Sequence, residues 1–292
     1  MWKSAFMKRV LRRLERLSPF GKHWPGHFYS PVPARGDVLK GIRAKKAARE
    51  ITEINFRMDE QTLRLSGYES LFDQFPFTKA PSPEHRFYLD NDYFTWLDAL
   101  FLFCFLCREK PRRIVEVGSG FSSALMLDVR DRFLTPSPEM TFIEPRPKVL
   151  KKLFRSEDLK QHRFIQAPVQ QAGFEVFDAL EAGDLLFVDS SHVVKYGSDV
   201  NYLLFEVLPR LRSGVFVHFH DVFENFEYPD AWLVQGRYWN ESYFLRAFLS
   251  GNNEWEIVFF NNVMARRHDA RIREKLPEFA GKGACSLYLR KK

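Results

Sequence analysis

The sequence is poor in cysteine and has no long apolar segment. Its 292 residues include only three cysteines, and this odd number argues against a disulfide framework and favours a reducing compartment. No apolar run reaches the roughly 20 residues of a membrane-spanning helix, and none resembles the core of a secretory signal. We therefore expect a cytoplasmic protein that is soluble or peripheral at a membrane.

Most of the chain also lacks an excess of positive charge. The net charge is +7, but residues 1–50 hold 13 Lys and Arg against 3 Asp and Glu, a balance of +10. The remainder holds 31 against 34, a balance of −3. A nucleic-acid enzyme usually carries its basic patch on the folded domain, so a nucleic-acid partner is not expected.

Two of the cysteines, Cys104 and Cys107, form a C-x-x-C pair. The pair lies inside the apolar run 100–107, and no second pair follows nearby. A zinc site usually needs further Cys or His ligands at similar spacing. The pattern therefore predicts two thiols of the hydrophobic core.

The first 84 residues are predicted to form an extension before the main domain. Residues 1–17 place apolar side chains on one helical face and Lys and Arg mostly on the other. Such a helix packs on its own domain or a second subunit, lies on an anionic membrane, or serves as a transit peptide. Residues 18–35, rich in Pro, Gly and aromatics, are expected to be irregular, and residues 37–75 to be helical and polar.

Apolar strands and helices alternate through residues 85–292, the predicted main domain. This alternation predicts a doubly wound α/β fold with a parallel sheet. A helix is expected at 91–109. Strands are expected at 113–117, 141–144, 163–167, 184–189, 214–221, 255–260 and 285–289, and further helices near 122–130, 146–155, 173–181, 196–211 and 243–249. The final strand is expected to be hairpin-like, because no second βα unit is visible before it.

A glycine turn follows the first of these strands. Gly118 and Gly120 allow a sharp turn and a close approach to a ligand, and the next helix offers free N–H groups. Ser123 stands where the dinucleotide fingerprint G-x-G-x-x-G has its third glycine. The acidic strand end at Glu116 fits an S-adenosylmethionine (SAM) site, so the turn alone is compatible with either cofactor.

Acidic residues and histidines follow the later strands. Glu144 ends the second strand, 24 residues after Gly120, where a carboxylate accepts ribose hydroxyls in both cofactor classes. Asp189 and His192 follow the fourth strand. His218, His220 and Asp221 lie at the end of the fifth, with both histidines on one face of the sheet. Such a cluster suits methyl transfer to a hydroxyl, which needs a base or a metal to remove its proton. His218 has the alternative role of a buried core imidazole.

Four runs in the chain carry a more specific signal. They are VEVGSGFSS at 115–123, FVDSSH at 187–192, VHFHD at 217–221 and RYWNE at 237–241. With these runs, residues 85–292 resemble the class I SAM-dependent methyltransferases, and are close to a bacterial group of uncharacterised members. The resemblance implies a Rossmann-like, seven-stranded methyltransferase sheet with a reversed last strand. It also implies that Glu116 and Gly118 line the methionine part of SAM and that Glu144 holds the ribose.

The chain is more distantly similar to metal-dependent catechol-type O-methyltransferases. By position, Asp189 matches their first metal ligand, His192 takes the place of their lysine, and His220 and Asp221 replace an acid–amide pair. Imidazole ligands favour Mn, Fe or Zn over Mg²⁺. The resemblance thus implies a metal site at Asp189, His220 and Asp221, although the two substitutions leave a metal requirement open.

The sequence therefore predicts a SAM-dependent methyltransferase that acts on a hydroxyl of a small molecule or glycan. His192 or His220 is expected to act as the base, with or without a metal. The cofactor site is expected to comprise Glu116, Gly118, Ser119, Gly120, Ser122, Glu144 and Asp189. An NAD-dependent oxidoreductase and a non-catalytic SAM-binding accessory protein remain the alternatives. Tyr228, Trp232, Arg237 and Trp239 are candidates for a lid over the acceptor or for surface packing, and Asn240 for a helix N-cap.

Overall fold

The computed structural model describes residues 21–44, 50–94 and 96–292. The chain divides into two compact units. One comprises the chain up to Glu50 together with Tyr228–Trp239, and the other comprises Ile51–Glu227 with Asn240–Lys292. The amphipathic helix predicted for residues 1–17 lies outside the described residues. No described helix is long and apolar enough to cross a membrane.

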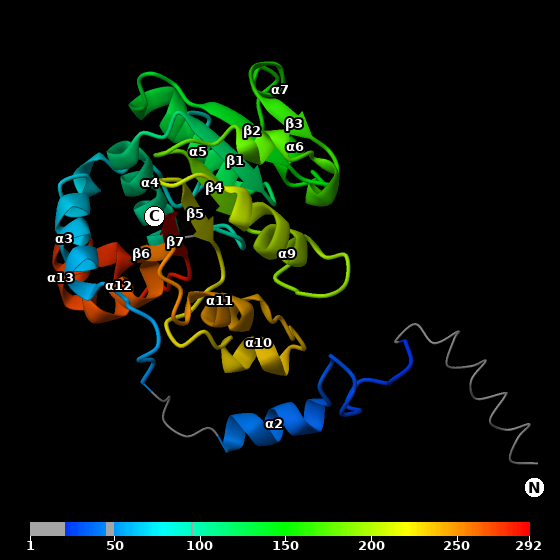
Figure 1. Cartoon of the computed structure of the whole chain (residues 1–292). Coiled ribbons are helices and arrows are strands. Elements are labelled where there is room, and N and C mark those ends of the chain that lie inside the picture. The colour runs from blue at the N-terminus through cyan, green and yellow to red at the C-terminus, as the bar shows by residue number, and fades with distance from the viewer. Residues whose placement is uncertain (1–20, 45–49, 95) are drawn as a thin grey trace, which may run out of the picture. The chain divides into compact units, whose positions relative to one another are not determined.

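The larger unit contains a seven-stranded sheet of order β3-β2-β1-β4-β5-β7-β6. The first five strands are mutually parallel, and β7 runs antiparallel to both β5 and β6 (Figure 1). The predicted seven-stranded sheet with a reversed last strand is confirmed. The strands are β1 (Arg113–Val117), β2 (Glu139–Ile143), β3 (Arg163–Ile165), β4 (Leu185–Val188), β5 (Phe216–Phe219), β6 (Trp255–Phe260) and β7 (Leu287–Lys291).

Helices cover both faces of this sheet. Figure 1 shows α4 and α5 on one side and α9 on the other, as right-handed crossovers on either side of β1 and β4 require. The helices of the larger unit are α3 (Met58–Glu69), α4 (Trp96–Glu109), α5 (Phe121–Phe133), α6 (Leu150–Leu153), α7 (Asp158–Gln161), α8 (Glu175–Asp178), α9 (Asp199–Tyr202), α11 (Glu241–Leu249), α12 (Asn261–Arg267) and α13 (Asp269–Lys275). The smaller unit contains α2 (Arg35–Arg43) and α10 (Asp230–Val234).

Some expectations about the helices were wrong. Residues 37–75 do not form one polar helical segment, because the described residues 50–57 are not helical and Arg57, just before α3, has φ = 50°. Two helices, α12 and α13, occupy the segment between the last two strands, where none was expected. Each has seven residues, which is too short to show a clear helical period in the sequence.

The hydrophobic core begins earlier in the chain than expected. Leu65 and Tyr68 of α3 are fully buried, and Tyr68 packs edge-on against Phe259 of β6. The larger unit therefore starts at residue 51, whereas the expected domain boundary was residue 84. The side chain of Cys104 in α4 is buried and that of Cys107 is half-buried, and both thiols are free.

A buried cluster of side-chain ion pairs holds the segment before α4 against α5 and α7. The Arg86 guanidinium donates to Asp128 of α5 at 2.8 Å and to both carboxylate oxygens of Asp158 at 2.6 and 2.8 Å. It also reaches Asp131 at 2.9 Å. Arg86 is 8% exposed, and Asp128 and Asp158 are 2% and 3% exposed. Removing Arg86 would therefore leave buried carboxylates without their cation.

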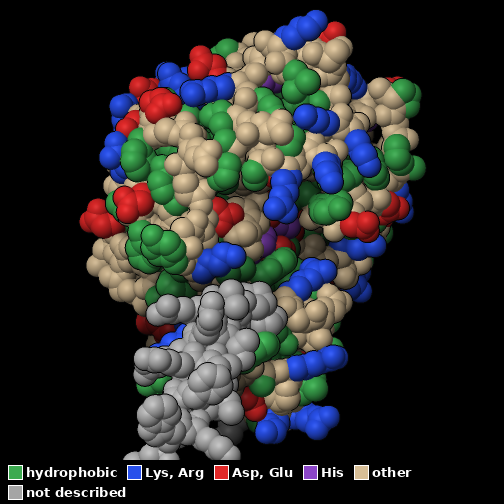
Figure 2. Space-filling view, turned by 90° about the vertical axis from the view of Figure 1, so that its right-hand side faces the viewer, with side chains coloured by type: hydrophobic (Ala, Val, Ile, Leu, Met, Phe, Trp, Pro, Cys, Tyr) green, Lys and Arg blue, Asp and Glu red, His purple; other side chains and the backbone are tan. Residues whose placement is uncertain are grey.

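The charged side chains visible from one side of the molecule are of mixed sign. On the face shown in Figure 2, Lys and Arg are scattered among acidic and apolar side chains and form no continuous basic patch. This distribution agrees with the charge balance of the sequence.

Candidate active site

The glycine turn between β1 and α5 is held between two neighbouring strands. Gly118 N–H donates to Ile143 of β2 at 3.0 Å, and Asp189 N–H after β4 donates to Val117 at 2.9 Å. Gly118 has φ = 85°, and a Cβ there would lie 1.7 Å from the carbonyl oxygen of Asp189. Only glycine fits this position. The two hydrogen bonds hold the turn against the ends of both β2 and β4.

Glu116 lies beneath the turn and not on the wall of the adjoining cavity. Its side chain is fully buried, and it accepts hydrogen bonds from Ser122 at 2.6 Å and from Ser123. Ser123 in turn accepts from Gly120 N–H at 2.9 Å. Burial raises the pKa of Glu116 to about 8, although the serine hydroxyls oppose the shift. Glu116 thus organises the turn from below, whereas the resemblance had implied contact with the methionine of SAM.

Replacing Glu116 with glutamine should remove a pH dependence of stability. The folded-state pKa of about 8 exceeds the usual pKa of a glutamate, so the folded protein holds the proton more tightly. Stability is then fully present at low pH and falls as the pH rises toward and through 8, by up to about 1.4 kcal/mol per pH unit. We expect urea unfolding of E116Q to lack this decline. Equal slopes for both proteins between pH 6 and pH 9 would contradict the assignment.

A cavity of about 260 Å³ opens at the carboxyl ends of β1, β2 and β4. Glu144 lies on its wall, where one carboxylate oxygen accepts from Arg146 N–H at 2.6 Å and the other from Ser119 N–H at 3.3 Å. The lining residues are Tyr93, Phe94, Gly118, Ser119, Gly120, Phe121, Ser122, Glu144, Arg146, Val149 and Asp189. All residues of the predicted cofactor site therefore lie on the cavity wall except Glu116, which contacts Ser122 from beneath the turn.

His192 lies in the loop after β4, surrounded by carboxylates. Its Nε2 is 3.3 Å from Asp189 and 3.4 Å from Asp221, and its Nδ1 is 2.8 Å from Glu241. Burial disfavours a charge on the ring, but the hydrogen bonds with Asp189 and Glu241 outweigh it and raise the pKa of His192 to about 10. His192 has φ = 58°, and its carbonyl oxygen accepts the backbone N–H groups of Asn240 and Glu241.

His220, at the end of β5, connects two groups of side chains. Its Nδ1 is 3.4 Å from Asp189 and 3.6 Å from Asp221. Its Nε2 points the other way, 3.6 Å from Cys285 Sγ and 3.8 Å from Asp98. Burial disfavours the imidazolium, but the acidic groups around it raise the pKa of His220. Of the two histidines proposed as the base, His220 is thus the one that faces Asp98 and Cys285.

His218 has the surroundings of a core residue. It is fully buried, and its ring stacks on Phe187 with 3.8 Å between centroids. Among the described residues neither ring nitrogen has a hydrogen-bond partner, and burial lowers the pKa of His218 to about 3. His218 is therefore a neutral packing residue.

Three residues around His192 and His220 were not predicted from the sequence: Asp98, Glu241 and Cys285. Asp98 is the one charged residue among the apolar side chains of 96–107, and this contrast was the signal for it. Glu241 ends the run RYWNE, which was noted only as part of the resemblance. Cys285 precedes β7, and nothing in the sequence connected it with His220. Asn240 stands at the N-cap of α11, but its side chain bonds the backbone of Val194.

Comparison with known sequences identifies the family. Residues 115–222, from β1 to just beyond β5, match the model of a family described as a methyltransferase domain. An uncharacterized protein of Archaeoglobus fulgidus is 36% identical over 170 residues, which cover 54% of this chain and 73% of that protein. By the family match, residues 115–222 form a methyltransferase domain. The match spans the glycine turn and the acidic residues at the strand ends, Glu116, Glu144, Asp189 and Asp221.

Solved methyltransferase structures resemble the chain at low sequence identity. The Podospora anserina methyltransferase PaMTH1, bound to S-adenosylhomocysteine (SAH), is 16% identical with a TM-score of 0.44, covering 89% of this chain and 98% of its own. The Bacillus cereus O-methyltransferase in complex with SAH is 12% identical with a TM-score of 0.41, covering 88% and 97%. The family assignment rests on the sequence matches and the strand order, not on these similarities.

The cavity of this methyltransferase suits the cofactor of its family. Glu144 presents a carboxylate at the end of β2, where it can accept ribose hydroxyls. A Cβ on Gly120 would enter the open space of the cavity, meeting only Val149 at 3.9 Å, so the backbone leaves room for a ligand. Asp189 reaches the same wall from β4. These residues fit a bound SAM.

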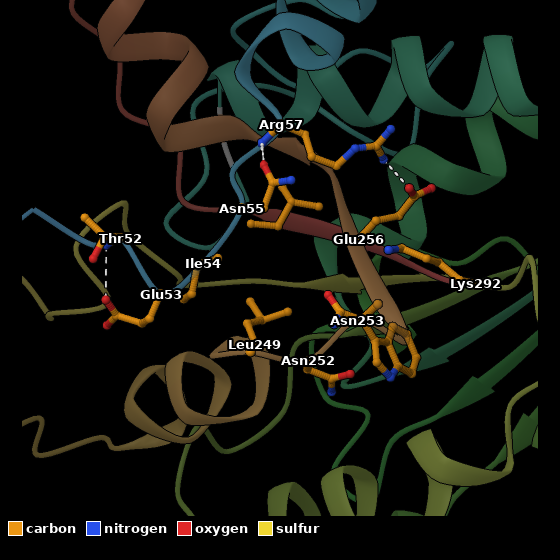
Figure 3. A pocket seen from close by; sticks show the side chains of 13 residues that line it. Thr52, Glu53, Ile54, Asn55, Arg57, Leu249, Asn252, Asn253, Glu256 and Lys292 are labelled. Carbon is orange, nitrogen blue, oxygen red and sulfur yellow. Dashed lines mark hydrogen bonds and ion pairs between the residues drawn. The ribbon is translucent and has the colours of Figure 1, made fainter.

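Two further features include none of the residues of this site. In the smaller unit, the Arg237 guanidinium lies over Trp232 and Trp239, 5.1 and 5.7 Å from the ring centroids, and a lid role for this cluster stays a prediction. In the larger unit, a cavity of about 460 Å³ lies beside the start of β6 (Figure 3). Its wall includes Arg57, paired with Glu256, and none of the predicted site residues.

Proposed function

We propose that this methyltransferase transfers the methyl group of SAM to a hydroxyl of a small molecule or glycan. The observation that carries the proposal is the position of Asp189. Asp189 lines the cofactor cavity, and its carboxylate lies within 3.4 Å of both His192 and His220. An acceptor hydroxyl held at Asp189 would therefore lie beside an imidazole and next to the cofactor.

His192 is the better placed of the two candidate bases. Glu241 accepts from its Nδ1 at 2.8 Å. Because the acidic neighbours outweigh burial and raise the pKa of His192 to about 10, the ring becomes the base only after Nε2, between Asp189 and Asp221, has lost its proton. The pairing with Glu241 corresponds to the role of the aspartate in a catalytic triad, which fixes the tautomer and stabilises the imidazolium. An acceptor hydroxyl between the two aspartates gives its proton to Nε2, and Glu241 then faces the charged ring.

The cofactor supplies an electrophilic methyl group on a sulfonium. The chain aligns the acceptor oxygen with it, and Asp189 and the backbone of the glycine turn, which contact each other directly, fix the relative positions of the two sites. Alignment of this kind can supply several kcal/mol of the barrier reduction. Asp189, His220 and Asp221 also offer ligand atoms within 4.8 Å of one another, so a metal-assisted form of the reaction is the second candidate.

Two measurements test the proposal in sequence. Calorimetric titration with SAH and, separately, with NAD⁺ should show binding of SAH alone. Methyl-labelled SAM is then incubated with a panel of phenols, sugars and oligosaccharides, with and without EDTA. Transfer of label to a hydroxyl supports the proposal, and loss of transfer in EDTA supports the metal-assisted form. Binding of NAD⁺ alone, or label found only on nitrogen or carbon acceptors, would overturn it.

Substituting His192 with glutamine should lower kcat about 10²- to 10⁴-fold, the range of general acid–base catalysis. Binding of SAH should change little, since His192 is absent from the cavity wall. The matched control is H162Q, a buried histidine whose ring packs edge-on against Phe142. We expect H162Q to keep the kcat of the unmodified protein. An unchanged kcat in H192Q would show that His192 is not the general base.

A further inference from the structure

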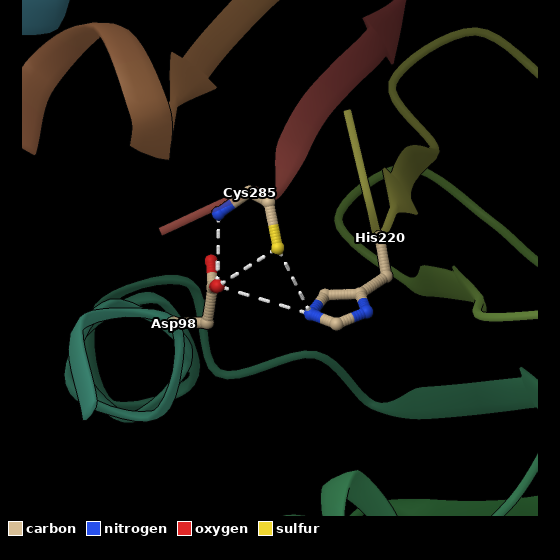
Figure 4. A group of neighbouring side chains, drawn as sticks. All are labelled: Asp98, His220 and Cys285. Carbon is tan, nitrogen blue, oxygen red and sulfur yellow. Dashed lines mark hydrogen bonds and ion pairs between the residues drawn. The ribbon is translucent and has the colours of Figure 1, made fainter. Parts of the chain in front are cut away.

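We propose that Asp98, His220 and Cys285 bind one divalent cation of the zinc type. The three side chains converge from α4, from the end of β5 and from the segment before β7 (Figure 4). They offer one oxygen, one nitrogen and one sulfur within 4.8 Å of one another. This site shares His220 with the Asp189–His220–Asp221 group but faces its other ring nitrogen, Nε2. It does not depend on the methyl-transfer proposal.

The distances among the three donor atoms fit tetrahedral zinc. Cys285 Sγ is 3.5 Å from Asp98 Oδ2 and 3.6 Å from His220 Nε2, and the oxygen and nitrogen are 3.8 Å apart. Zinc bond lengths of about 2.0 Å to oxygen and nitrogen and 2.3 Å to sulfur place tetrahedral donors about 3.3–3.6 Å apart. The observed triangle therefore needs only small shifts to hold the ion.

Neighbouring groups already orient two of the three donors. Asn261 donates to Asp98 Oδ1 at 2.7 Å, and Cys285 N–H donates to Asp98 Oδ2 at 2.9 Å. On His220, Nδ1 faces Asp189 at 3.4 Å, which leaves Nε2 for the ion. A carboxylate behind a metal-binding histidine is the usual arrangement at zinc sites, where it fixes the tautomer.

The sulfur of Cys285 has more acidic neighbours than its proton can satisfy. It lies 3.5 Å from a carboxylate oxygen of Asp98 and 3.3 Å from one of Asp221. A thiol donates only one hydrogen, so in the absence of a cation one of these contacts lacks a hydrogen. A cation bound by the thiolate resolves the conflict and balances the negative charge.

The donor set also determines which ion is bound. A thiolate with an imidazole selects zinc and similar borderline ions, whereas Mg²⁺ prefers oxygen ligands throughout. With three protein ligands, a tetrahedral ion keeps its fourth position open. The ion would also hold the His220 ring in the orientation that points Nδ1 at Asp189. Because Asp189 lines the cofactor cavity, the ion would help to position this part of the cavity wall.

Cobalt spectroscopy tests the site directly. The reduced full-length protein, stripped with a chelator, is titrated with Co²⁺. We expect one equivalent to bind with tetrahedral absorption bands and a thiolate-to-cobalt charge-transfer band, and Zn²⁺ but not Mg²⁺ to abolish both. In C285S the charge-transfer band should vanish, and affinity for Zn²⁺ should fall more than tenfold. The matched control, C107S, should keep the band, since Cys107 lies near the end of α4 and the proposed ligand Asp98 lies near its start.

Several results would overturn the proposal. No Co²⁺ binding would do so, as would binding without a thiolate band. A site that survives C285S but is lost in D221N would place the ion at Asp189, His220 and Asp221 instead. Should C285S fail to fold, the spectrum of the unmodified protein still decides, because its charge-transfer band must persist in C107S and disappear on addition of Zn²⁺.

Discussion

Substitution of Gly118 with alanine is expected to abolish SAH binding and to destabilise the larger unit by about 2–5 kcal/mol. The left-handed backbone at φ = 85° costs a residue with a Cβ about 1–2 kcal/mol. The new methyl group would also lie 1.7 Å from the carbonyl oxygen of Asp189, and relieving such a clash costs about 1–3 kcal/mol more. Because the turn must separate from β4, the cofactor cavity opens. Urea unfolding and calorimetry with SAH measure the two effects.

A matched control separates backbone strain from the clash. Gly183 precedes β4 and has φ = 90°, but a Cβ there would meet nothing within 4 Å. G183A should therefore lose about 1–2 kcal/mol of stability and keep its affinity for SAH. If G118A bound SAH as tightly as G183A does, the contact between the turn and Asp189 would have no role in the cofactor site.

Replacing Arg86 with alanine should give the second large effect, a loss of about 3–5 kcal/mol of unfolding free energy. The substitution leaves Asp128 and Asp158 buried without their cation, and breaking a buried ion pair from one side has a cost of this size. Burial opposes the charge on Asp158, but its hydrogen bonds with Arg86 lower its pKa, so the stabilisation is present at neutral pH and is lost in acid. The variant should therefore approach the unmodified protein in stability as the pH falls below about 4.

The control for this prediction is R112A. Arg112 pairs with Glu181, but their side chains are 65% and 41% exposed, and pairs in water contribute about 0–1 kcal/mol. Thermal unfolding should show a melting temperature about 10 °C lower for R86A and little change for R112A. Similar shifts in both variants would indicate that the buried cluster does not hold the segment before α4.

The sheet could be predicted from the sequence because its strands are short apolar runs bounded by glycines and charges. The glycine turn at Gly118 fixed the position of β1, and the acidic strand ends followed at regular intervals. The helices between β6 and β7 were not predicted, because each is too short to show a period and is stabilised by burial of residues such as Met264 and Ile272. Tertiary contact, and not local preference, determines them.

The candidate site was predictable only where it follows from topology. Parallel strands end at one edge of the sheet, so Glu144, Asp189 and His220 had to converge. Burial was not predictable: Glu116 ends a strand as Glu144 does, yet one lies beneath the turn and the other on the cavity wall. The direction of each ring nitrogen of His220 likewise depends on Asp98 and Cys285, whose proximity results from long-range packing.

The position of β7 has a consequence for how the protein is synthesised. β7 lies between β5 and β6, although both of these strands precede it in the chain. During translation β6 therefore emerges with no partner in the growing sheet, and it must wait until residues 287–291 have left the ribosome. Cys285 arrives with the same strand, next to His220. A nascent chain can thus assemble the turn at Gly118 early, whereas the cluster around His220 is completed only after Cys285 has been synthesised.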